Sequence, residues 1–307
     1  MSQFLPEGKL INTRENIAAF RSADSIRDAY KNETILEGRV ILCDANHNLH
    51  VDLGCMNGII PREEGAIGIR EGTTRDIALI SKVNKPVCFV ITDFAFDEFG
   101  DIYAVLSRRK VQEKCMENYI ANLSVGDIID ARICHMEPFG VFADIGAGIN
   151  ALLPIDSISV SRIPHPDVRF NSNQDIRAVV KCRDDLGRIV LTHKELLGTW
   201  EENASRFSVG ETVPGIVRST EKYGIFIELT PNLAGLAEIT ENVSPGQNTA
   251  VYIKSIIPER MKIKLIIVDC FDAVYPPAKL NYFVKGKHIS HWKYSPDSSE
   301  KLIESVF

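Results

Sequence analysis

Residues 138–146 read Pro138-Phe139-Gly140-Val141-Phe142-Ala143-Asp144-Ile145-Gly146, a run typical of a β-strand with one buried face. Successive side chains of a strand point to opposite faces, so alternate positions would face a core: Val141, Ala143 and Ile145. Phe142 and Asp144 would face solvent, and a bulge at Gly140 would bring Phe139 onto the same outer face. Two exposed rings on one strand pack poorly in a core but form a stacking platform for unpaired bases.

The same pattern occurs twice more in the chain. Residues 222–229 (Lys222-Tyr223-Gly224-Ile225-Phe226-Ile227-Glu228-Leu229) repeat the aromatic, glycine and outward acidic positions. Residues 46–53 carry histidines, His47 and His50, at both ring positions. A strand-like run precedes each copy, over 38–41, 130–133 and 214–217. Three spaced copies of one unit predict a tandem array.

Length and composition indicate a soluble globular protein. The 307 residues suffice for two or three domains, and 45% hydrophobic with 25% charged residues is ordinary for such chains. We expect neither a membrane span nor a signal peptide, because no apolar run is long enough and the N-terminus lacks a basic-then-apolar layout. Seven scattered cysteines without a CxxC pair indicate buried thiols in a reducing cytoplasm.

The formal charge of −6 argues against a protein that coats duplex DNA through bulk positive charge. It is compatible with a single-strand binder, whose affinity comes from stacking and a local basic groove.

The chain is predicted to be all-β with helical linkers. Unit two should hold strands over 127–136, 139–145, 149–153, 176–183 and 188–193, which suit a closed five-stranded barrel. Seven segments result: a helical lead-in over 1–34, a divergent barrel over 35–109, a linker helix over 110–123, a second barrel over 124–195, a linker over 196–207, a third barrel with a shortened loop over 208–269, and an extension over 270–307. Pro276-Pro277 marks a boundary within this extension.

Four motifs of the second unit resemble the RNA-binding repeat of bacterial ribosomal protein S1. They are Val125-Gly126-Asp127, Phe139-Gly140-Val141-Phe142, His165-Pro166 and Gly187-Arg188-Ile189-Val190-Leu191-Thr192. The resemblance is specific over 124–195, clear over 208–269 and loose over 35–109. It implies three tandem OB-fold barrels, the first of them divergent.

The resemblance also implies an RNA-binding face on two of the barrels. In unit two the two strand aromatics are Phe139 and Phe142, and the acid and the basic residue of the last hairpin are Asp184 and Arg188. In unit three the aromatics are Tyr223 and Phe226 and the basic residue is Lys262, while the acid is missing. The family's next-strand contact falls at Pro154 and Glu238, and Pro258 replaces the acid of unit three. Unit one keeps only His47 and His50, with Tyr103 at the basic position, which implies a degraded face.

Two further patterns have simpler interpretations. Gly146-Ala147-Gly148-Ile149-Asn150-Ala151 fits a dinucleotide fingerprint by letters, but Leu152-Leu153-Pro154 follows where a helix is required, so a turn between strands is favoured. His288 and His291 have metal-like spacing without further ligands nearby in sequence. No catalytic residues, cofactor or metal are therefore predicted.

The resemblance implies a non-enzymatic, cytoplasmic RNA-binding protein that acts in translation, with single-stranded mRNA and the small ribosomal subunit as partners and no membrane association. One alternative is an adaptor that uses its barrels to join ribosomal or RNA-processing machinery through protein contacts. Another is an accessory of an RNA-processing enzyme, because barrels of this type are also appended to nucleases.

Overall fold

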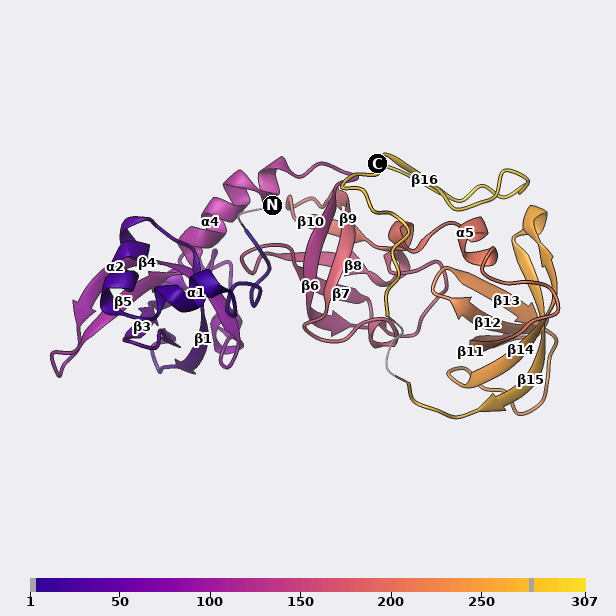
Figure 1. Cartoon of the computed structure of the whole chain (residues 1–307), viewed down its shortest axis with the longest axis horizontal. Coiled ribbons are helices and arrows are strands. Elements are labelled where there is room, and N and C mark those ends of the chain that lie inside the picture. Colours follow the sequence, from indigo (N-terminus) through magenta and orange to yellow (C-terminus); the bar gives the residue numbers. More distant parts are fainter. Residues whose placement is uncertain (1–3, 276–278) are drawn as a thin grey trace. The chain divides into compact units, whose positions relative to one another are not determined.

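The computed structural model describes residues 4–275 and 279–307 and contains three closed five-stranded barrels (Figure 1). The chain divides into two compact units, one of residues 1–123 with 144–150 and one of residues 124–143 with 151–307. The predicted fold class is confirmed. The boundary predicted at Pro276-Pro277 lies outside the described residues.

Barrel 1 follows two short helices, α1 (Arg14–Ala19) and α2 (Ala23–Lys31). Its strands join in the order β1-β2-β3-β5-β4, and β1 pairs with β4 to close the barrel. The strand bounds are β1 Leu36–Cys43, β2 Leu49–Asp52, β3 Asn57–Ile60, β4 Pro86–Phe96 and β5 Ile102–Ser107. The loop after β3 holds η1 (Arg62–Glu64) and α3 (Ile77–Ile80), and the barrel is followed by α4 (Arg109–Asn118) and η2 (Ile120–Asn122).

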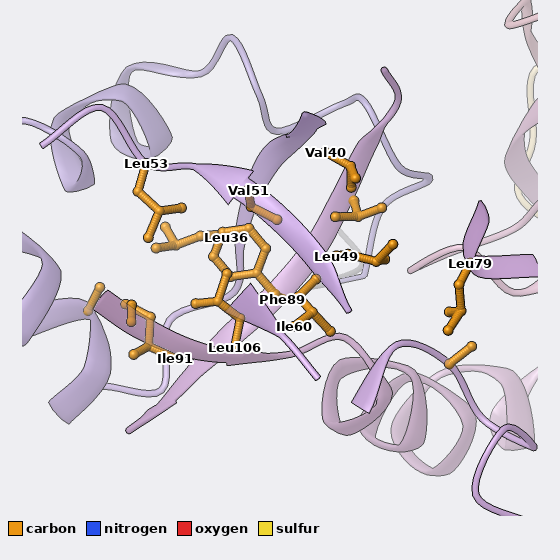
Figure 2. Packing of buried hydrophobic residues seen from close by; sticks show 14 of the residues in the cluster. Leu36, Val40, Leu49, Val51, Leu53, Ile60, Leu79, Phe89, Ile91 and Leu106 are labelled. Atoms are coloured by element: carbon orange, nitrogen blue, oxygen red, sulfur yellow. The ribbon is translucent and has the colours of Figure 1, made fainter. Parts of the chain in front are cut away.

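The core of barrel 1 is built around Phe89 of β4, which is fully buried (Figure 2). Side chains from the other strands surround this ring, among them Leu36, Val51, Ile60 and Leu106. Alternate residues along each short strand supply this interior, which is the pattern expected of a small barrel filled by side chains.

Barrel 2 has the same topology, with β10 pairing in parallel to β8 and antiparallel to β9. Its strands are β6 Ile128–Glu137, β7 Gly140–Asp144, β8 Asn150–Pro154, β9 Asp175–Arg183 and β10 Ile189–Thr192. The β8–β9 loop contains η3 (Ile155–Ser157) and η4 (Pro166–Val168), and η5 (Lys194–Leu197) and α5 (Trp200–Ala204) follow the barrel. Val141, Ala143 and Ile145 are buried, as the strand alternation predicts.

Barrel 3 repeats the topology with a short loop between its third and fourth strands. Its strands are β11 Thr212–Glu221, β12 Gly224–Thr230, β13 Leu233–Ala237, β14 Asn248–Ile257 and β15 Lys262–Phe271, with η6 (Pro258–Arg260) between the last two. The short strands β16 (His291–Lys293) and β17 (Glu304–Val306) pair near the C-terminus.

The glycine between the two aromatic residues of each pair has a steric role. In barrel 2, Gly140 has a φ of +157°, and a Cβ there would lie 2.5 Å from the carbonyl oxygen of Leu153. Gly224 repeats this in barrel 3, at 2.7 Å from the oxygen of Ala237. Between β11 and β12 the register shifts between Val217 and Ser219, on the strand opposite this glycine. In barrel 3 the expected bulge is therefore on β11, and the glycine permits close approach of two strands.

The segment 279–307 straps barrels 2 and 3 together within their unit. Tyr282 and Ile289 pack on the cluster of Ile128, Val179 and Leu196 in barrel 2. Trp292 and Tyr294 belong to the core cluster of barrel 3. Ile128 N donates to Lys287 O (2.8 Å), and Arg177 donates to the carbonyl of Val284 (2.7 Å). This C-terminal strap is thus built into the unit by backbone and side-chain bonds.

Candidate nucleic-acid interface

An aromatic pair stands on the outer surface of barrel 2 where β7 begins. The ring centroids of Phe139 and Phe142 are 6.1 Å apart and the ring planes meet at 85°. Phe139 is 54% exposed and Phe142 is half-buried, whereas Val141 between them is fully buried. The strand therefore separates core residues from a solvent-facing edge-to-face aromatic pair.

Barrel 3 reproduces this pair with different residues. The rings of Tyr223 and Phe226 are also 6.1 Å apart, at 89°, and Tyr223 is 69% exposed. The same ring arrangement therefore stands at matching positions of two barrels of different sequence.

The β9–β10 hairpin brings Asp184 and Arg188 together. Arg188 Nε donates to Asp184 Oδ2 (2.7 Å), while Asp184 Oδ1 accepts from the backbone nitrogens of Leu186 (3.0 Å) and Arg188 (2.8 Å). The hydrogen bond from the Arg188 backbone and the adjacent guanidinium lower the pKa of the Asp184 carboxyl. Asp184 thus shapes the turn and orients Arg188, whose side chain is largely exposed.

Strand register places Lys262 of barrel 3 at the position of Arg188. Val190 of β10 lies beside Leu152 of β8, and Lys264 of β15 lies beside Leu236 of β13. Arg188 precedes Val190 by two positions and Lys262 precedes Lys264 by two positions, so each lies on the same strand face as the residue it precedes. In barrel 1 the equivalent pair is Ile59 and Val105, so Tyr103 takes the basic position.

Lys264 is a surface residue that the sequence interpretation missed. It lies in a row across three strands, since Phe226 pairs with Leu236 and Leu236 with Lys264. Both Lys262 and Lys264 are exposed. The sequence feature that could have identified Lys264 is its two-residue spacing from Lys262 on a strand, which puts both side chains on the face of the aromatic pair.

The histidines of barrel 1 are held by acidic side chains. His50 Nε2 lies 3.3 Å from Asp44 Oδ2, and His47 Nδ1 lies 3.9 Å from Asp76 Oδ2. His47 has a left-handed φ of +61° and belongs to the turn before β2. This barrel has no aromatic pair at the equivalent positions among the residues that the structure describes.

The prediction that Asp144 and Glu228 face solvent is wrong. Both point away from their barrel interior, but other segments cover them and both are buried. Asp144 accepts from the backbone nitrogens of Glu7 (2.7 Å) and Gly146 (2.8 Å), and burial, with the nearby Glu7 charge, raises its pKa to about 6. Glu228 is enclosed by two arginines. Neither acid can contact RNA on the aromatic face.

The two patterns set aside in the sequence are a turn between strands and two histidines that pair with acids. Residues 146–149 form a turn between β7 and β8, where Ile149 N donates to Gly146 O (2.9 Å). His288 pairs with Asp127 (2.9 Å) and His291 with Glu304 (2.9 Å). Within the described part of the chain no group of three or more potential ligands could hold a metal ion. No helix among the described residues is long and apolar enough to cross a bilayer.

The barrel topology, with order 1-2-3-5-4 and a parallel contact between the third and fifth strands, defines a tandem array of OB-fold domains. Residues 122–194 match the family model of the S1 RNA binding domain. The second barrel is thus similar to the S1 RNA binding domain, and 84% of this chain is similar to a bacterial ribosomal protein bS1.

Three comparisons give the extent of this similarity. Small ribosomal subunit protein bS1 of Rhizobium meliloti (strain 1021) is 26% identical over 276 residues, which cover 84% of this chain and 47% of that protein. A 4-hydroxy-3-methylbut-2-enyl diphosphate reductase of Fusobacterium nucleatum is 28% identical over 267 residues, or 84% of this chain and 30% of that protein. A solved multidomain protein with nucleic acid binding domains from Streptococcus pneumoniae is 14% identical, with a TM-score of 0.25 over 77% of this chain and 74% of that chain. The chain therefore spans about half the length of the bS1 relative.

Proposed function

We propose that this chain binds single-stranded RNA through the outer faces of barrels 2 and 3 and acts in translation as a cytoplasmic protein without enzymatic activity. The observation that carries the proposal is the aromatic pair repeated at 6.1 Å on both barrels, next to exposed basic side chains. Bases stack on such rings whatever their identity, and guanidinium or ammonium groups contact the phosphates. Messenger RNA and the small ribosomal subunit are the partners that we propose.

Seven residues form the proposed contact set: Phe139, Phe142, Asp184, Arg188, Tyr223, Phe226 and Lys262. Lys264 extends it on barrel 3 because it shares the row of Phe226. Asp184 acts by orienting Arg188. Only 30% of the reductase's length matches this chain.

The direct test compares RNA forms with the purified full chain. Fluorescence anisotropy should give tighter binding to an unstructured RNA oligonucleotide than to a blunt RNA duplex of equal length, with little dependence on base composition. Equal or tighter binding to the duplex would contradict the proposal. Crosslinking and sequencing from cells should then place the contacts on messenger 5′ regions.

Barrel 1 supports a second function, as an adaptor for a protein partner. Phe99 at the tip of the β4–β5 hairpin is 89% exposed and Phe96 is also exposed. Asp97, Glu98 and Asp101 flank these rings, so the tip repels phosphates but suits a basic protein surface. A Phe96→Ser/Phe99→Ser variant should retain full RNA affinity and lose a co-purifying protein. A loss of RNA affinity would contradict the adaptor role.

A further inference from the structure

A cavity of about 910 Å³ lies between barrels 2 and 3, inside the unit that holds both. Its walls come from the β8–β9 loop, from β11, β12 and β14, and from the segment on either side of residues 276–278. This volume is in the range of small-molecule sites, which are concave and mix apolar walls with a few polar groups. The cavity is separate from the aromatic faces, because none of the seven proposed contact residues lines it.

Three buried charged side chains meet in the cavity wall. Glu228 accepts from Arg218 Nε at its Oε2 (2.8 Å) and from Arg218 Nη2 at its Oε1 (3.1 Å). The same Oε2 accepts from Arg169 Nη2 (2.5 Å). The side chains of Arg169, Glu228 and Arg218 are only 6%, 4% and 9% exposed. Two guanidinium groups therefore share one carboxylate, and the triad carries a net charge of +1 in a largely dry setting.

Glu228 is the only acid in the described part of the chain that lies within ion-pair distance of Arg169 or Arg218. Arg169 otherwise bonds only to the neutral hydroxyl of Ser159 (3.4 Å). Among the described residues, the Nη1 groups of Arg169 and Arg218 have no hydrogen-bond partner, although both arginines line the cavity. Burial lowers the pKa of the Arg169 guanidinium. Neither Nη1 atom is among the buried polar atoms that lack a partner, so both are open to solvent and to an anion that enters the cavity.

The rim of the cavity adds further positive charge and aromatic surface. Arg206 and Lys279 line the cavity and are exposed. Apart from Glu228, Asp167 is the one acid among the described lining residues. Phe271 and Phe283 contribute ring surface to the same space. Guanidinium groups match phosphate oxygens in geometry and charge, and phenyl rings stack on bases.

We propose that this cavity is a second binding site, for a nucleoside phosphate, with the phosphate held by Arg169 and Arg218 and the base against Phe271 or Phe283. The ligand is either a free nucleotide or one nucleotide of an RNA strand, since both present the same groups. The site does not depend on the aromatic faces of barrels 2 and 3. It would let the unit sense a small metabolite or grip a strand between its barrels.

The test uses the full chain carrying Phe142→Ala and Phe226→Ala, which removes one stacking ring from each outer face and leaves Phe139 and Tyr223 in place. Isothermal titration calorimetry would measure binding of ADP, GDP, adenosine and pyrophosphate, and anisotropy would measure a short RNA with a 5′-phosphate. Arg218→Gln should weaken ADP or RNA binding by about tenfold or more, because a hydrogen bond to a charged group is lost. That variant leaves Arg169 and Glu228 as a neutral pair, so the wall stays closed.

Arg206→Ala provides a variant without risk to folding, since its side chain is exposed at the rim. It should weaken binding severalfold, whereas Lys301→Ala, which changes net charge equally but lies outside the cavity lining, should have no effect. If ADP binds and Arg218→Gln weakens that binding, the ligand is a free nucleotide. If only the RNA binds and Arg218→Gln weakens its binding, the ligand is one nucleotide of an RNA strand. Pyrophosphate binding as tightly as ADP would overturn the nucleotide assignment. Binding of neither ADP nor RNA through Arg218 would overturn the site itself.

Discussion

Phe142 and Val141 are neighbours on β7 with opposite surroundings. Val141 is fully buried in the barrel, while Phe142 contacts Phe139 on the outside. Phe226 and Ile227 repeat this relationship on β12. A binding role and a core role can therefore be separated by substitutions at adjacent positions.

We expect Phe142→Ala to cost about 1–3 kcal/mol of RNA binding, because one stacking platform is lost. Phe226→Ala should cost a similar amount or less, and His50→Ala should have little effect because Asp44 already engages that ring. RNA affinity and melting temperature would be measured on each variant.

Ile227→Ala is the matched control for the aromatic substitutions. It should destabilise the protein by about 2–5 kcal/mol through a cavity, since Ile227 is fully buried. If Phe142→Ala instead lowered the melting temperature and retained RNA affinity, the ring would be a core residue and the binding face would be wrong.

Gly140 and Gly187 allow backbone strain and steric clash to be separated. Both have positive φ, but a Cβ at Gly187 meets nothing within 4 Å whereas one at Gly140 meets the Leu153 oxygen at 2.5 Å. Gly187→Ala should cost about 1–2 kcal/mol from the left-handed backbone alone. Gly140→Ala should cost clearly more, as measured by urea unfolding. Equal costs would contradict the role of Gly140 in the close approach of β7 and β8.

At the scale of strands, the sequence of barrel 2 was highly informative. Each expected strand bound agrees with the observed bound to within one residue, because β-branched alternation and turn glycines are local signals. The aromatic faces follow from the same alternation. Burial of Asp144 and Glu228 could not be predicted, since Glu7 and Arg169, which cover them, are distant in sequence. The cavity was missed for the same reason.

The C-terminal strap makes the stability of its unit depend on pH through His193. This ring is buried between Phe170 and Tyr282, and its Nε2 lies 3.2 Å from the Tyr282 hydroxyl. Burial lowers the pKa of His193 to about 4. The unfolded chain protonates this ring near pH 6.5, so the unfolded state binds more protons between about pH 6.5 and 4.

Lowering the pH through that window should therefore destabilise the unit, by up to about 1.4 kcal/mol for each unit of pKa depression. Urea midpoints at pH 7 and pH 5 would measure the effect. A His193→Gln variant, which does not titrate, should lose less stability than the wild type over the same interval. An equal loss in both proteins would attribute the pH dependence to other groups.

For the whole molecule, net charge limits how RNA binding responds to salt. The chain carries −6, and its proposed faces offer only Arg188, Lys262 and Lys264 as phosphate contacts. For single-stranded nucleic acid, the logarithm of the binding constant falls by about 0.7 per tenfold rise in salt for each phosphate neutralised. With three such contacts we expect a slope of about −2. Affinities measured from 50 to 400 mM KCl would give this slope.

Arg188→Gln should make the slope shallower by about 0.7, whereas Lys301→Gln, away from the proposed face, should not change it. A wild-type slope of about −5 or steeper would mean that many more phosphates are contacted than these faces allow.

The strap over barrels 2 and 3 also has a consequence for synthesis. A ribosome makes residues 124–271 before residues 279–307, so both barrels can fold while the side chains that the strap covers, Ile128 and Leu196, are still in water. The wall of the cavity that the later segment supplies is absent at that time. A nascent chain paused after β15 would thus present the aromatic faces of both barrels, while the apolar surface that the strap later covers stays exposed. That surface could bind chaperones or pair prematurely with other chains.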